Sequence, residues 1–553
     1  MNTFVSGNNT CNIRNIVLSL VMLVFLTQRS EAQVNSYDVL IRNGKIVDGT
    51  GSPWFIADVA ITDGEIVAIG KLTGATARQT IDATGKIVAP GFIDMMGQTA
   101  APFLKDPNLA FNLLSQGITT INAGEGESDA PLNEADGKQS GWQTMRQFLS
   151  KLDAAGMPIN MVQTVGHTQL RSIVIGDKDR AATAPEMERM RGMVREAMEA
   201  GAIGVSTSLI YPPAIYGSEQ EITELTKVAG QYGGRYFTHM RNEGDRLLEA
   251  IDEALRIGAA AGTPVHIFHL KTAGQGNWGK MDLALARVKA ARAEGQEVGV
   301  DVYPYINNGL GIRALLHPKY AADGQEALLA KLKDPNVKAE MRKDMESLSG
   351  WENWYAHAGK DWNKIIVANL GNTGYSQYNG KSIGAIATAT GKSPWDVFFD
   401  LCLHNIFAGP QSMSEANKIK AMREEFTSFD TDAGPTRAED AAHPRAFGAF
   451  PRVLSRYVKD LGVLTLEGAI HRMTSVAANE VMAYDRGRLS PGTAADIVIF
   501  DYNKIHDNAT FESPSAASTG MEWVLVNGAV VFADGKYTGA KPGRVIRGPG
   551  YKK

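Results

Sequence analysis

The stretch EGDRLLEAIDEALRIGAAAGTPVHIFHLKT, residues 243–272, joins a helical pattern to a strand pattern. Its first part predicts an amphipathic helix that ends in glycine, because its apolar residues recur at helical spacing. These residues are Leu247, Leu248, Ile251, Leu255 and Ile257. From Pro264 onward, a short apolar run is typical of a buried strand. A helix that leads directly into a buried strand is the unit from which parallel sheets are built.

The same alternation covers most of the chain. Eight apolar runs, separated by helical patterns, predict an α/β fold with a (β/α)8 barrel. The runs are Ile87–Met95, Ile118–Gly124, Asn160–Gly166, Ile203–Leu209, Arg235–His239, Pro264–Leu270, Glu297–Tyr303 and Phe426–Thr431. The span 306–425 is too long for a single connection and includes a helical pattern. We interpret it as an insertion over the mouth of the barrel.

Both ends of the chain have a different pattern. In residues 33–90, short apolar runs alternate with Asn-Gly, Asp-Gly and Gly-Thr-Gly turns, which is typical of hairpins. Residues 483–553 repeat this pattern in ADIVIFD and MEWVLVNGAVVFADGKYTG. We predict that the two ends form one small β domain, which flanks a catalytic barrel over residues 91–482.

Residues 1–32 are typical of a secretory signal peptide. An apolar run at Ile16–Leu26 precedes Ser30-Glu31-Ala32, which has the small-x-small pattern of a cleavage site. The run is shorter than the roughly 20 residues that span a bilayer, and no other run is long enough. We predict cleavage after Ala32 and export to the periplasm or the medium. An uncleaved anchor is the alternative.

Composition and charge fit a large globular protein with a small-molecule partner. The chain has 553 residues, 44% of them hydrophobic, and a net charge of -4. This charge provides no basic surface for nucleic acid. Of the two cysteines, Cys11 lies in the predicted signal, so the exported chain would keep only Cys402 and form no internal disulfide.

Polar side chains follow five of the predicted strands, at the end of the barrel where active sites lie. They are Glu125 and Glu127, His167, His239, His269 with Lys271, and Asp430 with Asp432. Two histidines from neighbouring strands and a carboxylate would form a zinc site with nitrogen and oxygen ligands. A further aspartate could take a proton from the metal-activated water and pass it to a leaving amine.

Alternation of side chains along a strand separates two of the histidines. In PVHIFHLKT, residues 264–272, His266 and His269 fall on opposite faces. We predict that His269 points into the barrel and that His266 packs against the helices. Alternation does not distinguish between the members of the other two pairs, Glu125 and Glu127 or Asp430 and Asp432.

In these segments the chain resembles the D-aminoacylase, or N-acyl-D-amino-acid deacylase, branch of the amidohydrolase superfamily. The resemblance follows the order of the family from about residue 37 to 545, nearly the whole exported chain. Its segments are YDVLIRNGKIVDGTG, APGFID, QGITT, VGHTQLR, GAIGVSTSLIYPP, THMRNEGDRLLEAIDEAL, HLKTAGQGNWGK, DVYPY, HPRAFGAFPRVLSRYV and DRGRLSPGTAADIVIFD. It implies a small β domain from both termini, a metal-dependent barrel and hydrolysis of an amide.

The resemblance implies a metal site that is only partly present. It assigns ligands to His239 and His269, a catalytic aspartate to Asp432 in TDAG, and a place beside the site to His167. The family's first strand ends in Asp-x-His-x-His, but residues 94–98 read DMMGQ and contain neither histidine. Its second strand carries Gly-Asn-Cys-Gly with a bridging cysteine, whereas AGEGES stands here.

These differences predict a hydrolase with one metal ion. Glu125 is the preferred third ligand and Glu127 the alternative. We expect Zn2+, and another divalent metal would also suit these ligands. Asp432 is expected to carry the proton from the water to the leaving amine, and His167 to help stabilise the oxyanion.

The resemblance also places three side chains at the substrate. Arg445, Lys271 and Tyr211 correspond to groups that hold the α-carboxylate of an N-acyl amino acid, and a guanidinium suits a carboxylate. We therefore expect hydrolysis of N-acyl amino acids, with D-configured substrates favoured. The alternatives are a dipeptidase or cyclic-amide hydrolase on the same scaffold, and an exported binding protein without catalytic activity.

Overall fold

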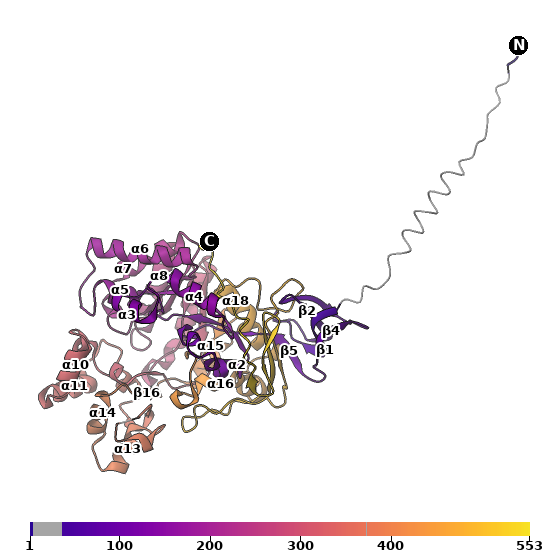
Figure 1. The fold of residues 1–553 in the computed structure, drawn as a ribbon. Helices are drawn as coiled ribbons and strands as arrows, with labels where there is room; N and C mark the ends of the chain where they lie inside the picture. Colours follow the sequence, from indigo (N-terminus) through magenta and orange to yellow (C-terminus); the bar gives the residue numbers. More distant parts are fainter. Residues whose placement is uncertain (4–35, 372) are drawn as a thin grey trace.

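The computed structural model describes residues 1–3, 36–371 and 373–553. The predicted signal peptide therefore lies outside the described residues, apart from its first three. A barrel forms the middle of the molecule, with a small β domain on one side and a lobe from residues 310–410 on the other (Figure 1). Among the described helices, none combines the length and the hydropathy that a membrane span requires.

Each of the eight predicted runs contains a strand of the barrel. These strands are β6 (Phe92–Asp94), β7 (Ile118–Ala123), β8 (Asn160–Gln163) with β9 (Val165–Gly166), β10 (Gly204–Ser208), β11 (Arg235–His239), β12 (Val265–Ile267), β13 (Val298–Val302) and β17 (Thr427–Phe429). Neighbours pair in parallel within two arcs, β6-β7-β8 and β9-β10-β11-β12-β13-β17. The arcs join because Met95 N donates to Phe429 O at 3.3 Å and Ile203 N donates to Gln163 O at 2.8 Å.

The first predicted run, Ile87–Met95, is wrong as a single strand. It divides into β5 (Ile87–Pro90), which belongs to the small β domain, and β6 of the barrel. The break falls at Gly91, where a Cβ atom would lie 2.1 Å from Oγ1 of Thr119 on the neighbouring strand. Glycine permits this close approach, so the chain passes from one sheet to the other at this residue.

Strands from both ends of the chain form one nine-stranded sheet, the small β domain. The strands besides β5 are β1 (Ser36–Ile46), β2 (Phe55–Thr62), β3 (Glu65–Gly70), β4 (Thr76–Asp82), β18 (Ile497–Phe500), β19 (Met521–Val526), β20 (Ala529–Ala533) and β21 (Lys536–Tyr537). β5 lies between β1 and β18 and connects the two sets. Ile41, Val59 and Ile497 are buried in one shared core, so the two ends depend on each other for folding. The exact residue limits of the domains, 33–90, 91–482 and 483–553, stay predictions.

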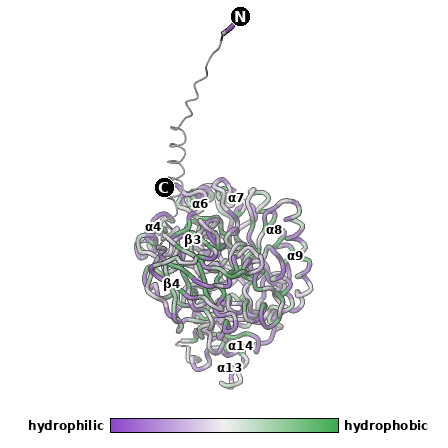
Figure 2. The backbone as a smooth tube through the Cα atoms, turned by 90° about the vertical axis from the view of Figure 1, so that its right-hand side faces the viewer, coloured by the Kyte–Doolittle hydropathy of each residue, from purple (hydrophilic) through white to green (hydrophobic). Residues whose placement is uncertain are grey.

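Helices lie around the outside of the barrel, and hydrophobic segments gather toward the middle of the molecule (Figure 2). The longer helices are α4 (Met145–Ala155), α6 (Ala184–Ala200), α7 (Glu219–Gly230), α8 (Leu247–Ala261) and α9 (Met281–Ala293). α8 is the helix predicted from residues 243–272, and it ends at Gly262 in the left-handed conformation, with φ 66°. Its Ile251 belongs to the same apolar cluster as Ile267 of β12, so the apolar stripe read from the sequence is the face that packs on the sheet.

The lobe has a core of its own. Its three-stranded sheet contains β14 (Leu310–Gly311), β16 (Phe407–Pro410) and β15 (Ile365–Ala368). Its helices are α10 (Gln325–Lys331), α11 (Pro335–Ser347), α12 (Trp354–His357), α13 (Ile383–Thr390) and α14 (Pro394–Cys402). Trp354, Trp362, Trp395 and Phe398 are buried together in its centre. The chain then returns to the barrel through α15 (Glu415–Met422), which packs on β13 and β17.

Candidate metal centre

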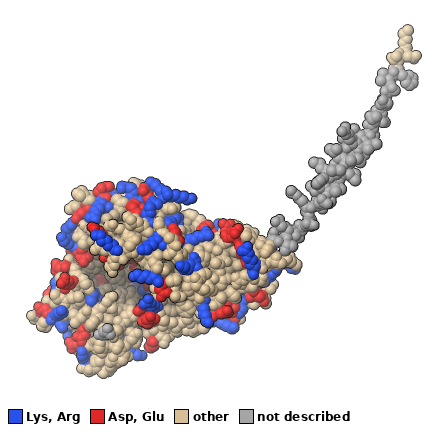
Figure 3. Space-filling view, in the orientation of Figure 1, with Lys and Arg blue, Asp and Glu red and all other residues tan. Residues whose placement is uncertain are grey.

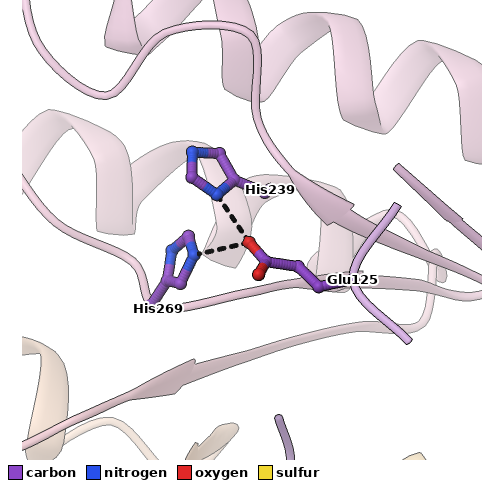
Figure 4. Close-up of side chains that lie close together, drawn as sticks. All are labelled: Glu125, His239 and His269. Atoms are coloured by element: carbon purple, nitrogen blue, oxygen red, sulfur yellow. Dashed lines mark hydrogen bonds and ion pairs between the residues drawn. The ribbon is translucent and has the colours of Figure 1, made fainter. Parts of the chain in front are cut away.

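Three side chains at the carboxyl ends of barrel strands meet in one cluster (Figure 4). Glu125 follows β7, His239 ends β11 and His269 follows β12. Oε1 of Glu125 lies 2.7 Å from Nδ1 of His239 and 3.3 Å from Nε2 of His269. One ligand atom from each residue lies within 4.8 Å of the other two. Two imidazole nitrogens and a carboxylate oxygen at this spacing suit a zinc ion.

The backbone around the cluster is strained at residues other than glycine. His269, Asp432 and Gln98 have φ angles of 36°, 44° and 61°, in a region that side chains with a Cβ atom disfavour. Each such residue costs on the order of 1–3 kcal/mol and persists only where other contacts hold it. At His269 the contact is a hydrogen bond from its backbone N–H to the carboxylate of Asp301. These three residues bring side chains from distant strands together at the cluster.

The predicted orientation of β12 is wrong. Ile267 belongs to the apolar layer under the helices, whereas Phe268 packs with Phe237 inside the barrel. His266 contacts Phe237 on this inner face, with 5.7 Å between the ring centroids. The strand ends at Ile267, and the left-handed backbone at His269 breaks the alternation. His269 therefore reaches the site by a turn of the chain, and His266 is a packed residue of the barrel interior.

Glu243 connects His269 to Lys271 behind the cluster. Its Oε1 accepts a hydrogen bond from Nζ of Lys271 at 2.6 Å and lies 3.0 Å from Nδ1 of His269. Burial opposes ionisation of Glu243, but Lys271 and the two histidines hold its pKa well below the usual range. A carboxylate at the second nitrogen of a histidine fixes the ring and its tautomer, so Nε2 of His269 stays directed at Glu125.

Asp432 lies on the other side of the cluster. Its Oδ2 forms a 2.6 Å ion pair with Arg445, and its Oδ1 accepts a hydrogen bond from Nε2 of Gln98 at 2.9 Å. The same nitrogen of Gln98 donates to Oε2 of Glu125, also at 2.9 Å. Burial raises the pKa of Asp432, while Arg445 opposes the rise. A carboxyl group beside this cluster is placed to accept and donate a proton.

The three predicted substrate contacts differ in their surroundings. Arg445 lies over the ring of Tyr303, with its guanidinium carbon 4.9 Å from the ring centroid. Tyr211 contacts the ring of His239 edge to face, with 5.7 Å between centroids. Lys271 is buried, and its Nζ lies 2.6 Å from Oε1 of Glu243 and 2.6 Å from Nδ1 of His269, so its contacts support the position of His269.

His167 and Glu127 lie apart from the cluster. Nε2 of His167 is 2.8 Å from Glu221, which also accepts hydrogen bonds from Arg171. Within the described residues, Nδ1 of His167 has no hydrogen-bond partner. These contacts attach His167 to α7 and lend no support to the predicted role in oxyanion stabilisation. Glu127 is exposed and lines a cavity, so it is Glu125 that the structure brings to the histidines.

Three residues of the site were missed by the sequence analysis. Glu243 carried a signal, because it follows His239 by four residues in HMRNE. Gln98 stands at a position where the family has a histidine. The missing histidine was recognised, but no role was predicted for Gln98 itself. Tyr303 ends the strand run in DVYPY. Met96, at the other missing histidine, is buried in the apolar interior of the barrel and takes no part in the cluster.

A cavity of about 620 Å³ lies beside the cluster, between the barrel and the lobe. Tyr211 and Glu127 line it from the barrel, and Arg313, Tyr320 and His404 line it from the lobe. Figure 3 shows a hollow on this face, bordered by charged side chains. Tyr211 connects the cluster to the cavity, because its ring both contacts His239 and lines the cavity.

Comparison with known proteins agrees with this geometry. Residues 79–532 match the amidohydrolase family. A D-aminoacylase from Alcaligenes xylosoxydans xylosoxydans is 32% identical over 528 residues, which cover 94% of this chain and 99% of the relative. An N-acyl-D-glutamate deacylase from the same organism is 34% identical over 520 residues, which cover 92% of this chain and 96% of the relative.

Solved structures lead to the same group. The N-acyl-D-glutamate deacylase from Bordetella bronchiseptica, complexed with zinc and a phosphonate mimic of the tetrahedral intermediate, matches with a TM-score of 0.79 and 32% identity, over 93% of this chain and 100% of that one. A D-aminoacylase with a binuclear metal centre matches with a TM-score of 0.78 and 33% identity, over 92% and 99%. This chain therefore belongs to the amidohydrolase family, in its branch of D-aminoacylases and N-acyl-D-amino-acid deacylases, and is a hydrolase of carbon–nitrogen bonds in linear amides.

Proposed function

We propose that the protein removes the acyl group from N-acyl-D-amino acids, with one zinc ion held by Glu125, His239 and His269. The observation that carries the proposal is the cluster of these side chains beside the carboxylate of Asp432. The substrate class is suggested by the relatives, which are a D-aminoacylase and deacylases of N-acyl-D-glutamate and N-acyl-D-aspartate.

The three side chains fit a metal ion. Oε1 of Glu125 and the two imidazole nitrogens face one another, and Glu243 engages the other nitrogen of His269. Among the described residues, this is the one group of three such ligands within reach of each other, which favours a single ion. When bound, the ion supplies a Lewis acid that polarises the scissile carbonyl and makes water more acidic.

Asp432 is the proton carrier in this proposal. Its carboxylate accepts a proton from the attacking water as the new carbon–oxygen bond forms. It then donates that proton to the amide nitrogen as the carbon–nitrogen bond breaks. The ion pair with Arg445 and the hydrogen bond from Gln98 hold the carboxylate in place through both steps.

The charges around Tyr303 are suited to the free carboxylate of the substrate. Arg445 and Lys271 both lie over its ring, 4.9 and 5.6 Å from the centroid. The amino-acid side chain would then extend past Tyr211 into the 620 Å³ cavity. The mixed lining of this cavity, with carboxylate, guanidinium and aromatic groups, does not favour one side-chain class.

Turnover of a defined panel tests the proposal. Zinc-loaded protein is incubated with N-acetyl-D-amino acids, with their L-enantiomers and with dipeptides, and the released amine is measured. We expect the D-compounds to be hydrolysed fastest. Turnover of dipeptides alone would move the assignment to a dipeptidase, and binding without any turnover would move it to a binding protein.

The variant Asp432→Asn tests the proton carrier. An amide has nearly the same shape but does not accept the proton, so we expect kcat to fall by about 10²–10⁴-fold while the metal stays bound. Asp440→Asn, the same change at an exposed aspartate, is the control and should leave kcat unchanged. Full turnover by Asp432→Asn would remove Asp432 from the mechanism.

We also propose that the chain is exported, on the basis of the pattern in residues 1–32. The mass of the protein recovered from a periplasmic or culture fraction tests this. A chain that begins close after Ala32 would support export with cleavage, whereas recovery of the full-length chain from the cytoplasm would contradict it.

A further inference from the structure

Gln98 makes two contacts of equal length to the two functional carboxylates. Its Nε2 lies 2.9 Å from Oε2 of Glu125 and 2.9 Å from Oδ1 of Asp432. An amide NH2 group has two hydrogens and no lone pair to offer, so it can donate once to each oxygen. The amide oxygen in the same place would face two negative charges. The surrounding carboxylates therefore fix which end of the amide points at the site.

The Glu125 carboxylate divides its two oxygens between different partners. Oε1 faces the imidazoles of His239 and His269, and Oε2 faces only the amide of Gln98 among its described hydrogen bonds. A carboxylate that bridges two metal ions gives one oxygen to each. Here an uncharged donor stands at the second of these places, on the side toward Asp432.

We propose that Gln98 is a positioning residue whose amide joins the carboxylates of Glu125 and Asp432, so that these two groups do not together hold a second metal ion. This inference rests on the proposed function in taking a single ion at the site, Glu125 as a ligand and Asp432 as the proton carrier. It explains how two neighbouring carboxylates keep their positions in a site with a single ion.

The backbone fixes Gln98 for this role. Its φ of 61° is left-handed, a conformation that persists only where contacts hold it. The carbonyl oxygen of Gln98 accepts a hydrogen bond from the backbone N–H of Gly124 at 2.8 Å, and Gly97 N donates to Asn122 O at 2.9 Å. The backbone of Gln98 is thus attached to the end of β7, immediately before Glu125. This attachment fixes the positions of the two side chains relative to each other.

The electrostatic consequence differs from that of a metal ion. Two carboxylates close together repel, and Nε2 of Gln98 lies 2.9 Å from an oxygen of each. The amide offsets part of this repulsion without adding a full positive charge. Asp432 can then still accept a proton, which a divalent ion at the same place would oppose.

Counting metal ions in matched variants tests the inference. Gln98→Glu keeps the length of the side chain but replaces the donor by a third carboxylate, so Glu125, Asp432 and the new group should together bind a second divalent ion. After equilibration with excess zinc and gel filtration, elemental analysis should give about one ion per chain for the natural protein and about two for Gln98→Glu. Gln143→Glu, the same change at an exposed glutamine, should stay at one.

Gln98→Ala tests positioning without adding charge. We expect the metal content to stay at one ion while kcat falls by about 10–100-fold, with little change in KM, as for other residues that orient a metal site. Circular dichroism and thermal unfolding establish that each variant is folded, and this smaller change serves if Gln98→Glu does not fold.

Two results would overturn the inference. One is a natural protein with two tightly bound ions. The other is a folded Gln98→Ala with natural kcat together with a folded Gln98→Glu that binds one ion. The metal count does not depend on a substrate. If no N-acyl amino acid were turned over, the proposed function would fail, but the metal counts of the variants would still test the role of Gln98.

Discussion

His266 lies in β12 and His269 follows shortly after the strand ends, and their surroundings raise the pKa of both to about 9. Burial lowers the pKa at each, but carboxylates outweigh it, Asp301 and Glu480 at His266 and Glu243 with Glu125 at His269. A shifted pKa therefore does not tell which histidine is functional. The arrangement of partners does, because only His269 shares a carboxylate oxygen with a second imidazole.

The backbone separates the two histidines in the same way. His266 lies in the regular part of β12, and its two nitrogens lie 3.1 and 2.9 Å from Glu480 and Asp301 inside the barrel. His269 follows the end of the strand and has a φ of 36°. A buried imidazole with two fixed partners on regular backbone holds the fold together, whereas strain is tolerated where ligands from different strands must meet.

His269→Ala should have the largest effect on activity. It removes one of the three proposed ligands, so we expect the metal to be lost and kcat/KM to fall by about 10³-fold or more, since a Lewis acid contributes several kcal/mol to transition-state stabilisation. The melting temperature should change little. Elemental analysis and initial rates measure this. His506→Ala, at an exposed histidine, should behave as the natural protein, and a metal-loaded, active His269→Ala would break the comparison.

His266→Ala should damage stability and leave the metal site almost intact. Removal of the imidazole takes one buried partner from the carboxylates of Asp301 and Glu480, which costs about 3–5 kcal/mol. Chemical denaturation measures the loss, and elemental analysis of the folded fraction should still give the natural metal content. Loss of metal at unchanged stability would mean that the roles of the two histidines are reversed.

The pH dependence of stability sharpens this prediction. The pKa of His266 is raised in the folded protein, from 6.5 to about 9. The folded state therefore holds a proton that the unfolded state releases, and the stabilisation is complete below pH 6.5 and lost as the pH rises toward 9. His266→Ala should lack this slope. A parallel pH profile for the variant and the natural protein would show that folding does not shift the pKa of His266.

Glu243→Gln should have an intermediate effect. It keeps the shape of the side chain but removes the charge that orients His269 and pairs with Lys271. We expect metal affinity to fall by about 10–100-fold, measured by competition with a chelator. Glu249→Gln, the same change at an exposed glutamate of α8, is the matched control. Equal metal affinities for the two variants would mean that the carboxylate of Glu243 is not needed to orient His269.

The sequence predicted those parts of the molecule that depend on local pattern. α8 was readable because its apolar stripe and its terminal Gly262 lie in one continuous segment. The eight strands were readable for the same reason. The division at Gly91 was not, because it results from the approach of Thr119, a residue of another strand. No pattern within the run Ile87–Met95 distinguishes one sheet from two.

The residues of the site divide in the same way, into those that local pattern could predict and those that it could not. His239, His269 and Glu125 could be proposed, because each stands at the end of a predicted strand. The family resemblance also assigns ligands to the two histidines. The inner position of His266 could not, since alternation was extended past the true end of β12 at Ile267. Gln98 could be recognised only as a missing histidine. Its role depends on a left-handed backbone and on two carboxylates from remote segments, which a single sequence does not reveal.

Lys418 provides a contrast to His266, as a buried cation without fixed partners. Its Nζ lies 4.2 Å from the centroid of the Tyr303 ring and, within the described residues, has no hydrogen-bond partner. Burial and the nearby Lys271 lower its pKa to about 7. The folded protein therefore releases a proton that the unfolded chain keeps up to pH 10.5, so stability should rise with pH across this window, opposite in sign to the effect of His266.

Lys418→Met should therefore stabilise the protein, with the smallest effect of the four variants. The change removes a buried donor that lacks a partner, so we expect the free energy of unfolding to increase by about 1–2 kcal/mol at pH 6. The gain should shrink between pH 7 and pH 10.5, as the natural lysine loses its charge. Denaturant unfolding at several pH values measures it, with Lys420→Met, at an exposed lysine of the same helix, as the control. A gain that is constant with pH would show that folding does not shift the pKa of Lys418, and a loss of stability would show that its charge is paired after all.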